Sequence, residues 1–334
     1  MNTAKFWQRT DEGQIQCKLC PHNCTIAEGR TGLCRVRRVE DGELKATGYG
    51  LLSSVNLDPI EKKPLYHFHP GTMIFSIGGW GCNFACIFCQ NWTISQQVVT
   101  QCERYSPEDV VEKASASKSA ERSIGIAYTY NEPLVAFEFV EDCARLARSE
   151  GLLNVLVTNG YIEPEPAAKL LPLIDALNID IKSMDDAFYR RQCRGTLAPV
   201  QAFARQAVEA GCHVEITNLI IPGLNDDESQ IEALAKWIHR FLGEAIPLHL
   251  SAYHPQYKLK VPATPTELLE HAHRICRKEL LHVYLGNVLT ARGQDTVCPQ
   301  CGTILVARRG YTTEVRGIRN GVCEKCGRLV AGVM

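Results

Sequence analysis

Three cysteines in the first half of the chain have a spacing that suits an iron–sulfur cluster. Cys82, Cys86 and Cys89 form a C-x3-C-x2-C pattern with no fourth cysteine nearby. A cubane cluster is usually held by four thiolates, so three leave one iron open to a ligand. The chemistry of S-adenosylmethionine (SAM) needs such an open iron, because the amino acid end of SAM chelates it before one electron passes into the sulfonium. The alternative is a structural zinc site that borrows a distant ligand.

A second cysteine group lies near the C-terminus and has the spacing of a zinc ribbon. Two C-x2-C pairs are separated by 21 residues, and a glycine follows each pair. The four residues are Cys298, Cys301, Cys323 and Cys326. Four thiolates in two such pairs close a tetrahedral zinc site. Rubredoxin-like iron uses the same ligands and remains the alternative.

A third group occupies the N-terminal segment. Its members are Cys17, Cys20, Cys24 and Cys34. His22 is a substitute ligand within the same segment. Such a set suits either zinc or a complete second cluster. We favour zinc here, because Gly29 and Gly32 precede Cys34 in a pattern that resembles the turn of a zinc knuckle.

The composition indicates a reducing compartment for these thiols. The chain has 334 residues and 16 cysteines, of which eleven fall in the three groups. Residues 1–13 are polar and lack the apolar core of a signal peptide, and no apolar run is long enough to span a bilayer. We therefore predict a cytoplasmic protein with no membrane contact, whose clustered cysteines are metal ligands rather than disulfides.

The net charge of -1 excludes a bulk attraction to nucleic acid or to an anionic membrane. One segment near the C-terminus is nevertheless basic. Its cationic residues are Arg308, Arg309, Arg316, Arg319, Lys325 and Arg328. This cluster leaves contact with RNA or with an acidic protein surface open, although a solvated ribbon surface explains the charges as well.

The elements that must position the central triplet alternate between strand and helix. Seven short apolar runs predict strands at 73–77, 124–128, 155–158, 177–181, 214–220, 248–251 and 283–285. Apolar residues with helical period lie between them, for example in 200–208 and 231–242. Continuous apolar strands are typical of a parallel sheet covered on both faces. We predict an α/β fold with a full or partial (β/α) barrel, because no G-x-G-x-x-G motif follows the first strand.

The chain divides into three predicted parts around this barrel. They are a cysteine-rich N-terminal segment (1–62), the barrel (63–289) and a ribbon-like C-terminal segment (290–334). Two helix starts carry capping signals. Ser106 is an N-cap followed by Pro107 and the first-turn acids Glu108 and Asp109, and Thr264 precedes Glu267 at capping-box spacing.

Several short motifs together resemble the radical SAM superfamily. They are Cys17-Lys18-Leu19-Cys20-Pro21-His22-Asn23-Cys24, Gly81-Cys82-Asn83-Phe84, Gln90-Asn91-Trp92, Tyr128-Thr129-Tyr130-Asn131-Glu132-Pro133, Thr158-Asn159-Gly160 and Ile221-Pro222-Gly223-Leu224-Asn225. Nearly the whole chain is similar to the radical SAM protein of the AmmeMemoRadiSam system, a relative of the glycyl-radical-enzyme activases such as that of pyruvate formate-lyase. The resemblance implies a radical SAM barrel with a [4Fe-4S] cluster and SAM. It also implies an electron donor of flavodoxin or ferredoxin type and a complex with the companion proteins of that system.

In barrels of this kind, the chemistry lies at the carboxyl ends of the strands. The resemblance assigns Glu132, after the second strand, to the amino group of SAM. Relatives carry Gly-Gly-Glu-Pro there, whereas this chain has Tyr130 and Asn131 in place of the glycines, and Asn131 is itself a candidate cofactor contact. Asn159, after the third strand, is a candidate for the ribose or carboxylate of SAM. The alternatives are a glutamate that caps the next helix and a turn asparagine.

Four further residues are candidates for catalysis. Asp180 and Lys182 resemble the D-x-K element of the activases, and residues two apart on a strand face the same side. Asp180 is also a candidate for cofactor binding, with a solvated ion pair as the alternative. His254 is either an acid or base near the substrate or a structural histidine. Cys193 follows the strand of Asp180 closely enough to lie near the pocket.

These expectations combine into one reaction class. We predict reductive cleavage of SAM to a 5′-deoxyadenosyl radical, which abstracts a hydrogen atom from an unidentified substrate. One alternative is an activase that forms a glycyl radical on a partner enzyme. Another is a metal-stabilised module that binds RNA or protein, in which all three cysteine groups are structural.

Overall fold

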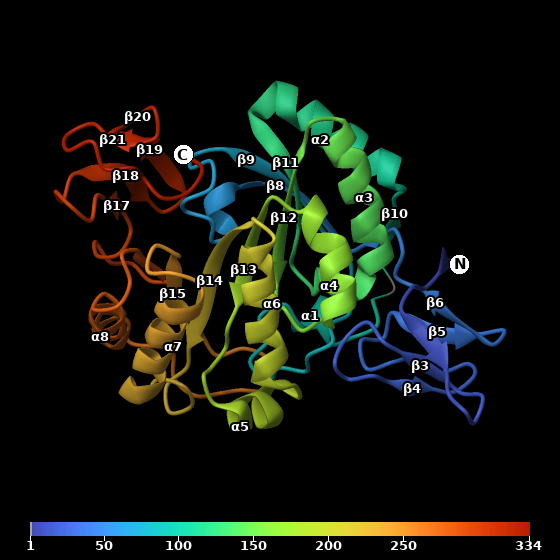
Figure 1. The fold of residues 1–334 in the computed structure, drawn as a ribbon. Helices are drawn as coiled ribbons and strands as arrows, with labels where there is room; N and C mark the ends of the chain where they lie inside the picture. Colours follow the sequence, from blue (N-terminus) through green and yellow to red (C-terminus); the bar gives the residue numbers. More distant parts are fainter. Residues whose placement is uncertain (1, 100) are drawn as a thin grey trace.

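A central sheet of eight strands forms the core of the fold (Figure 1). The computed structural model describes residues 2–99 and 101–334. Seven strands are parallel and lie side by side in chain order, and β8 joins the first of them in antiparallel pairing. The strands are β8 (Ser54–Pro59), β9 (Met73–Gly78), β11 (Ser123–Tyr128), β12 (Leu153–Thr158), β13 (Ala176–Asp180), β14 (His213–Ile220), β15 (Leu248–Ala252) and β16 (Val283–Gly286).

The sheet is open rather than closed. Its two edges are β8 and β16, and among the described residues no pairing joins them. The prediction of an α/β fold with a parallel sheet is confirmed, whereas a full barrel is not.

The seven predicted strands all form, each within two residues of its predicted bounds. Most of their residues are buried, so the continuous apolar runs reflect a sheet covered on both faces. Helices connect the strands, and Figure 1 shows the longer ones along one face of the sheet. They are α1 (Trp92–Ser95), α2 (Pro107–Glu121), α3 (Phe137–Ser149), α4 (Pro164–Leu170), α5 (Asp186–Phe188), α6 (Leu197–Glu209), α7 (Glu228–Phe241) and α8 (Thr266–Cys276), with shorter turns η1 (Ile60–Lys62), η2 (Pro133–Ala136), η3 (Leu171–Leu173) and η4 (Tyr189–Cys193).

One of the two predicted helix caps is present and the other is wrong. Ser106 and Asp109 form a reciprocal capping box at the start of α2. At α8 the residue before the helix is Pro265, not Thr264. The buried Thr264 hydroxyl instead accepts from the Tyr253 amide and donates to the Ile220 carbonyl, which ties the ends of β14 and β15 together.

The N-terminal segment consists of short strands and lies near the carboxyl ends of the central strands (Figure 1). Two small sheets form, with the orders β1-β6-β5 and β2-β3-β4, and β7 pairs with β10. The strands are β1 (Asn2–Thr3), β2 (Trp7–Arg9), β3 (Ile15–Cys17), β4 (Thr25–Ile26), β5 (Arg37–Glu40), β6 (Glu43–Ala46), β7 (Leu51–Leu52) and β10 (Glu103–Arg104). Because β8 belongs to the central sheet, residues 54–59 of the predicted segment 1–62 are part of the core. The three-part division itself stays a proposal.

The C-terminal ribbon lies at the opposite end, beside the amino ends of the strands (Figure 1). It contains a sheet of β17 (Thr296–Val297), β18 (Ile304–Arg309) and β19 (Thr312–Val315), and a hairpin of β20 (Ile318–Arg319) and β21 (Val322–Cys323). Arg308 anchors it, because its buried guanidinium donates to the Tyr66 carbonyl at 2.7 Å and stacks over the Tyr66 ring.

Several cations of the basic C-terminal segment are buried or paired within the protein. Arg308 does not reach the surface, and Arg316 and Arg319 each pair with a glutamate of the ribbon itself. The cationic surface offered to a nucleic acid is therefore smaller than the sequence suggests. No helix within the described residues is both long and apolar enough to cross a membrane.

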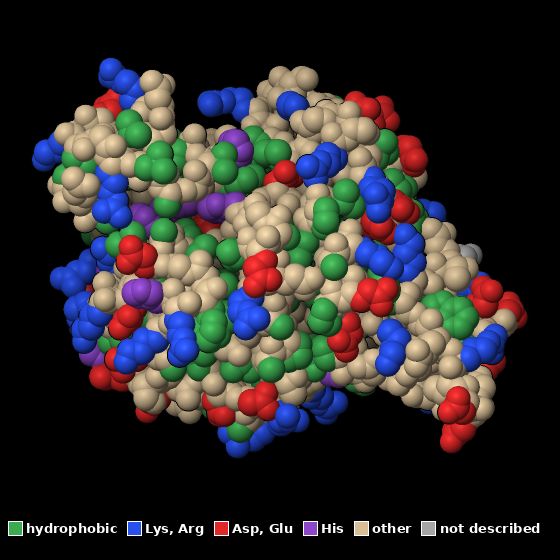
Figure 2. All heavy atoms as spheres, in the orientation of Figure 1, with side chains coloured by type: hydrophobic (Ala, Val, Ile, Leu, Met, Phe, Trp, Pro, Cys, Tyr) green, Lys and Arg blue, Asp and Glu red, His purple; other side chains and the backbone are tan. Residues whose placement is uncertain are grey.

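A buried carboxylate, Glu215 on β14, organises the junction between core and ribbon. Its two oxygens accept from the backbone amides of Tyr66 and His67 and lie 3.0 and 2.6 Å from the ring nitrogens of His213 and His249. Figure 2 shows histidine side chains along the seam between the ribbon and the rest of the molecule. The network thus joins the loop before β9 to the central sheet.

We expect this junction to lose stability in mild acid. Burial lowers the pKa of His67 to about 4 and that of His282 to about 3, whereas an unfolded histidine titrates near 6.5. Below pH 6.5 the unfolded chain therefore binds more protons than the native one, and the free energy of unfolding falls by roughly 2–3 kcal/mol between pH 6.5 and 5.

Denaturant unfolding at half-unit pH steps measures this loss. Replacing both histidines by glutamine should remove most of the slope above pH 5. A stability that stays level down to pH 4.5 would show that these imidazoles are not held neutral.

Candidate functional site

The three central cysteines lie on the loop between β9 and α1. Gly81 turns this loop with a φ of +84°, and a side chain there would lie 2.4 Å from the carbonyl oxygen of Cys34. The amides of Ala85 and Ile87 donate to the carbonyls of Cys193 and Gln192 in η4. The backbone of the cysteine loop is therefore fixed by contacts with two distant segments.

Glu132 and Asn159 reach this loop from the ends of the next two strands. The Glu132 carboxylate accepts from the Thr158 hydroxyl at 2.6 Å, and from the amides of Asn159 and Leu134 at 2.8 and 3.0 Å. The Asn159 side-chain amide donates to the oxygen of Asn83 at 2.9 Å and lies 3.6 Å from the Cys82 sulfur. The two predicted residues thus belong to one hydrogen-bonded unit with the cysteine loop.

Burial raises the pKa of Glu132 to about 7, although the three hydrogen bonds that it accepts oppose the shift. Both protonation states of the carboxyl group are therefore populated near neutral pH. Asn131 has a different position: its side-chain amide donates to the Gly81 carbonyl at 3.0 Å, so it braces the residue before Cys82.

Asp180 and Lys182 lie at the end of β13 and form an ion pair of 3.0 Å. The Lys182 side chain is largely buried, whereas that of Asp180 is 36% exposed. Burial alone would lower the pKa of Lys182, but the charges of Asp180 and the nearby Cys86 raise it well above its usual value. A permanent cation therefore stands beside the sulfur of Cys86.

Cys193 is fully buried and is a neighbour of Cys86. Burial raises the pKa of Cys193, so it stays a thiol. His254 differs from the other predicted residues, because it is exposed and contacts only the Asn287 carbonyl at 3.2 Å.

Comparison with known proteins gives the family of this site. A family model described as the radical SAM superfamily matches residues 77–238. An uncharacterised protein of Methanocaldococcus jannaschii is 42% identical over 336 residues, which cover 99% of either chain. The chain belongs to the radical SAM superfamily. It is accordingly a radical SAM enzyme, and this family implies SAM and a [4Fe-4S] cluster as cofactors.

Two further likenesses are more distant. The pyruvate formate-lyase 1-activating enzyme of Escherichia coli is 25% identical over 185 residues, covering 54% of this chain and 74% of that enzyme. The crystal structure of a radical SAM methyltransferase from Sphaerobacter thermophilus aligns with a TM-score of 0.53 at 17% identity, covering 65% and 67% of the two chains. The second likeness supports the fold.

The residues around the cysteine loop fit the radical SAM cofactor. The loop supplies three thiols, and the Phe84 amide and the Asn159 side chain donate toward the Cys82 sulfur. Hydrogen bonds to ligand sulfurs are a usual feature of iron–sulfur sites. The cation of Lys182 also suits a site that must hold a cluster with anionic ligands.

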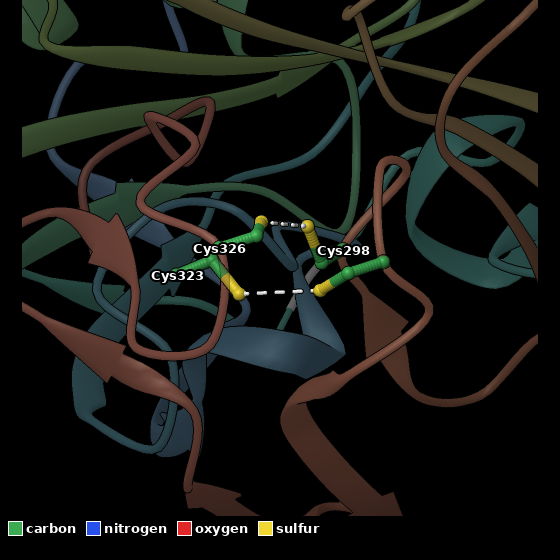
Figure 3. Close-up of side chains that lie close together, drawn as sticks. Cys298, Cys323 and Cys326 are labelled. Atoms are coloured by element: carbon green, nitrogen blue, oxygen red, sulfur yellow. Dashed lines mark hydrogen bonds between the residues drawn. The ribbon is translucent and has the colours of Figure 1, made fainter.

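The C-terminal cysteines form the tightest cluster of potential ligands. Figure 3 shows their sulfur atoms turned toward one another. The Cys298–Cys326 and Cys301–Cys323 sulfurs are both 3.6 Å apart, and all four lie within 4.8 Å. A zinc ion with 2.3 Å bonds to sulfur requires about 3.8 Å between the sulfurs of a tetrahedron, so the set matches a single ion.

Sequence reasoning missed two residues of this radical SAM site. Asn83 joins Asn159 to the Tyr161 carbonyl through its side-chain amide. Tyr189 accepts the Lys182 amide at its hydroxyl, 2.9 Å away, and so fixes the backbone beside the cation. The position of Asn83 directly after Cys82 was a usable signal, whereas nothing in the sequence pointed to Tyr189.

Proposed function

We propose that this protein cleaves SAM reductively at Cys82, Cys86 and Cys89 and uses the product to abstract a hydrogen atom from a substrate above the sheet. A reduced [4Fe-4S] cluster supplies the electron that splits SAM into methionine and a 5′-deoxyadenosyl radical. The observation that carries the proposal is the convergence of Glu132, Asn159 and Lys182, from three successive strand ends, on one loop with three cysteines.

We propose that Glu132 receives the amino group of SAM. An ionised carboxylate offers about four acceptor positions, and Glu132 uses three of them within the protein. The fourth is left for an ammonium group, whose charge would favour the ionised form of a carboxylate that burial disfavours. Asn159 would hold the ribose or carboxylate from the neighbouring strand, and Asn131 would position the loop at Gly81.

We assign the substrate side to the later strand ends. Asp180 is partly exposed and anchored to Lys182, so it can face a bound molecule while Lys182 faces Cys86. Cys193, a buried thiol beside Cys86, would tune the Cys86 sulfur. His254, being exposed, would contribute only when a substrate covers it.

The remaining assignments follow from chemistry and resemblance. We propose zinc at the C-terminal cysteines, since their spacing matches one tetrahedral ion. A flavodoxin or ferredoxin would supply electrons in the cytoplasm, and the companion proteins of the AmmeMemoRadiSam system would be partners.

One experiment tests the reaction itself. Anaerobically reconstituted protein, incubated with dithionite and SAM, should release 5′-deoxyadenosine and methionine in equal amounts, measured by liquid chromatography and mass spectrometry. Iron and acid-labile sulfide should be present in the same sample. A colourless protein that contains zinc alone would support the metal-stabilised binding module instead.

An activating enzyme that forms a glycyl radical on a partner is the second candidate function, because the similarity to the Escherichia coli activating enzyme spans 54% of the chain. It differs only in substrate. Candidate partner enzymes, incubated with the reduced protein and SAM, would then show the doublet EPR signal of a glycyl radical.

A further inference from the structure

The N-terminal cysteines surround a pocket in which their sulfur atoms do not gather as the ligands of a single metal ion do. Cys17, Cys20, Cys24 and Cys34 all line this pocket. Within the part of the chain that the structure describes, no three of these sulfurs gather within 4.8 Å, unlike the C-terminal set. Sulfurs bound to one zinc ion stand about 3.8 Å apart. The N-terminal set therefore does not match single-ion geometry.

A cubane cluster explains this wider spacing. Its four thiolates bind four different irons, so they stand farther apart than the ligands of one ion. The rest of the pocket lining is partly apolar, with Leu19, Ile26 and Val135. Apolar surroundings that exclude water are among the means by which proteins tune such clusters.

A buried arginine with a hydrogen-bond donor that is unpaired in the described part of the chain lines the same pocket. Arg37 lines it and its side chain is only 1% exposed. The guanidinium donates to both oxygens of Glu138 at 2.6 and 2.8 Å and to the Lys5 carbonyl at 2.9 Å. Its Nε is buried and finds no acceptor among the described residues. A buried donor without a partner is costly, and a cluster with four thiolates would supply both negative charge and acceptor sulfurs.

We propose that Cys17, Cys20, Cys24 and Cys34 hold a second iron–sulfur cluster, with all four irons ligated by the protein. Sequence alone favours zinc at this position, whereas the spacing of the sulfurs and the buried Arg37 donor favour the cluster. A cluster without an open iron cannot bind SAM, so its chemistry is electron exchange.

The second site lies directly against the SAM-cleaving loop. Asn83, the residue after Cys82, lines the N-terminal pocket, and its carbonyl lies 2.7 Å from His22. On the other side of Cys82, Gly81 packs against the Cys34 carbonyl. An electron carrier at this position would therefore be a neighbour of the catalytic cysteines.

Metal analysis of matched variants tests the proposal. The full chain, reconstituted anaerobically, should contain about eight irons and eight sulfides. Cys24→Ser should lower this content by about half and leave the zinc content unchanged. Cys212→Ser is the control, because Cys212 is half-buried outside all three groups and its thiol donates to the carbonyls of Leu171 and Ile174.

A second variant tests the N-terminal site without relying on SAM cleavage and without altering the N-terminal segment. Replacing Cys82, Cys86 and Cys89 together by alanine leaves the N-terminal set intact. After reduction, this variant should retain about four irons and an EPR signal that does not change when SAM is added. If it contains no iron, and Cys24→Ser loses zinc instead, the second cluster does not exist, whatever the outcome for SAM cleavage.

Discussion

Cys86→Ala should abolish the formation of 5′-deoxyadenosine. Two thiolates do not hold a cubane with one open iron in place, so the electron that cleaves SAM is no longer delivered. We expect a fall of at least roughly a thousandfold, since enzymes accelerate their reactions by a million-fold or more. The measurement is the initial rate of product release from anaerobic protein with dithionite and SAM.

Two other cysteines provide the controls for this prediction. Cys143 is buried in α3 away from the three cysteine groups, so Cys143→Ala should keep both iron and activity. Cys193→Ala removes a buried thiol beside Cys86 that is not one of the three proposed ligands, and should keep the cluster with altered spectra. If Cys193→Ala instead lost as much iron as Cys86→Ala, Cys193 would be a ligand and the assignment of the open iron would be wrong.

Glu215→Ala should destabilise the fold more than any surface substitution. The carboxylate is fully buried and satisfies two backbone amides and two histidines, so its removal leaves several buried donors without acceptors. Breaking such a buried network costs about 3–5 kcal/mol of unfolding free energy. Denaturant unfolding of reconstituted protein measures the loss.

Glu215→Gln separates charge from hydrogen bonding at the same position. The glutamine side chain keeps one acceptor oxygen, so the free energy of unfolding of this variant should lie between those of the wild type and the alanine variant. Glu232→Ala is the surface control, since Glu232 pairs with Lys236 in solvent and contributes little. Equal stability of Glu215→Ala and the wild type would mean that the network does not hold the junction together.

The regular part of the fold could be read from the sequence. Strands such as 124–128 are unbroken apolar runs, and Ser106, followed by Pro107 and two first-turn acids, marks the start of its helix. Both signals are local, because burial on two faces and a capping box each depend on residues close in the chain. For the same reason the three cysteine groups were found by spacing alone.

What the sequence could not supply depends on contacts between distant segments. Thr264 has the spacing of a cap, but its hydroxyl bonds the ends of two strands. Arg308 belongs to a basic run, yet it is buried against Tyr66, 242 residues away. The choice between zinc and a cluster at the N-terminus likewise rests on how far apart the folded chain holds four sulfurs.

The ribbon lies beside the amino ends of the strands, whereas Cys82 follows the carboxyl end of β9. The two cysteine groups therefore lie at opposite ends of the strands. The zinc proposed for the ribbon would lie far from the reacting atoms, and it would contribute to the stability of the molecule rather than to its chemistry. An organism short of that metal would lose enzyme by turnover of the polypeptide, while each surviving copy kept its full catalytic speed.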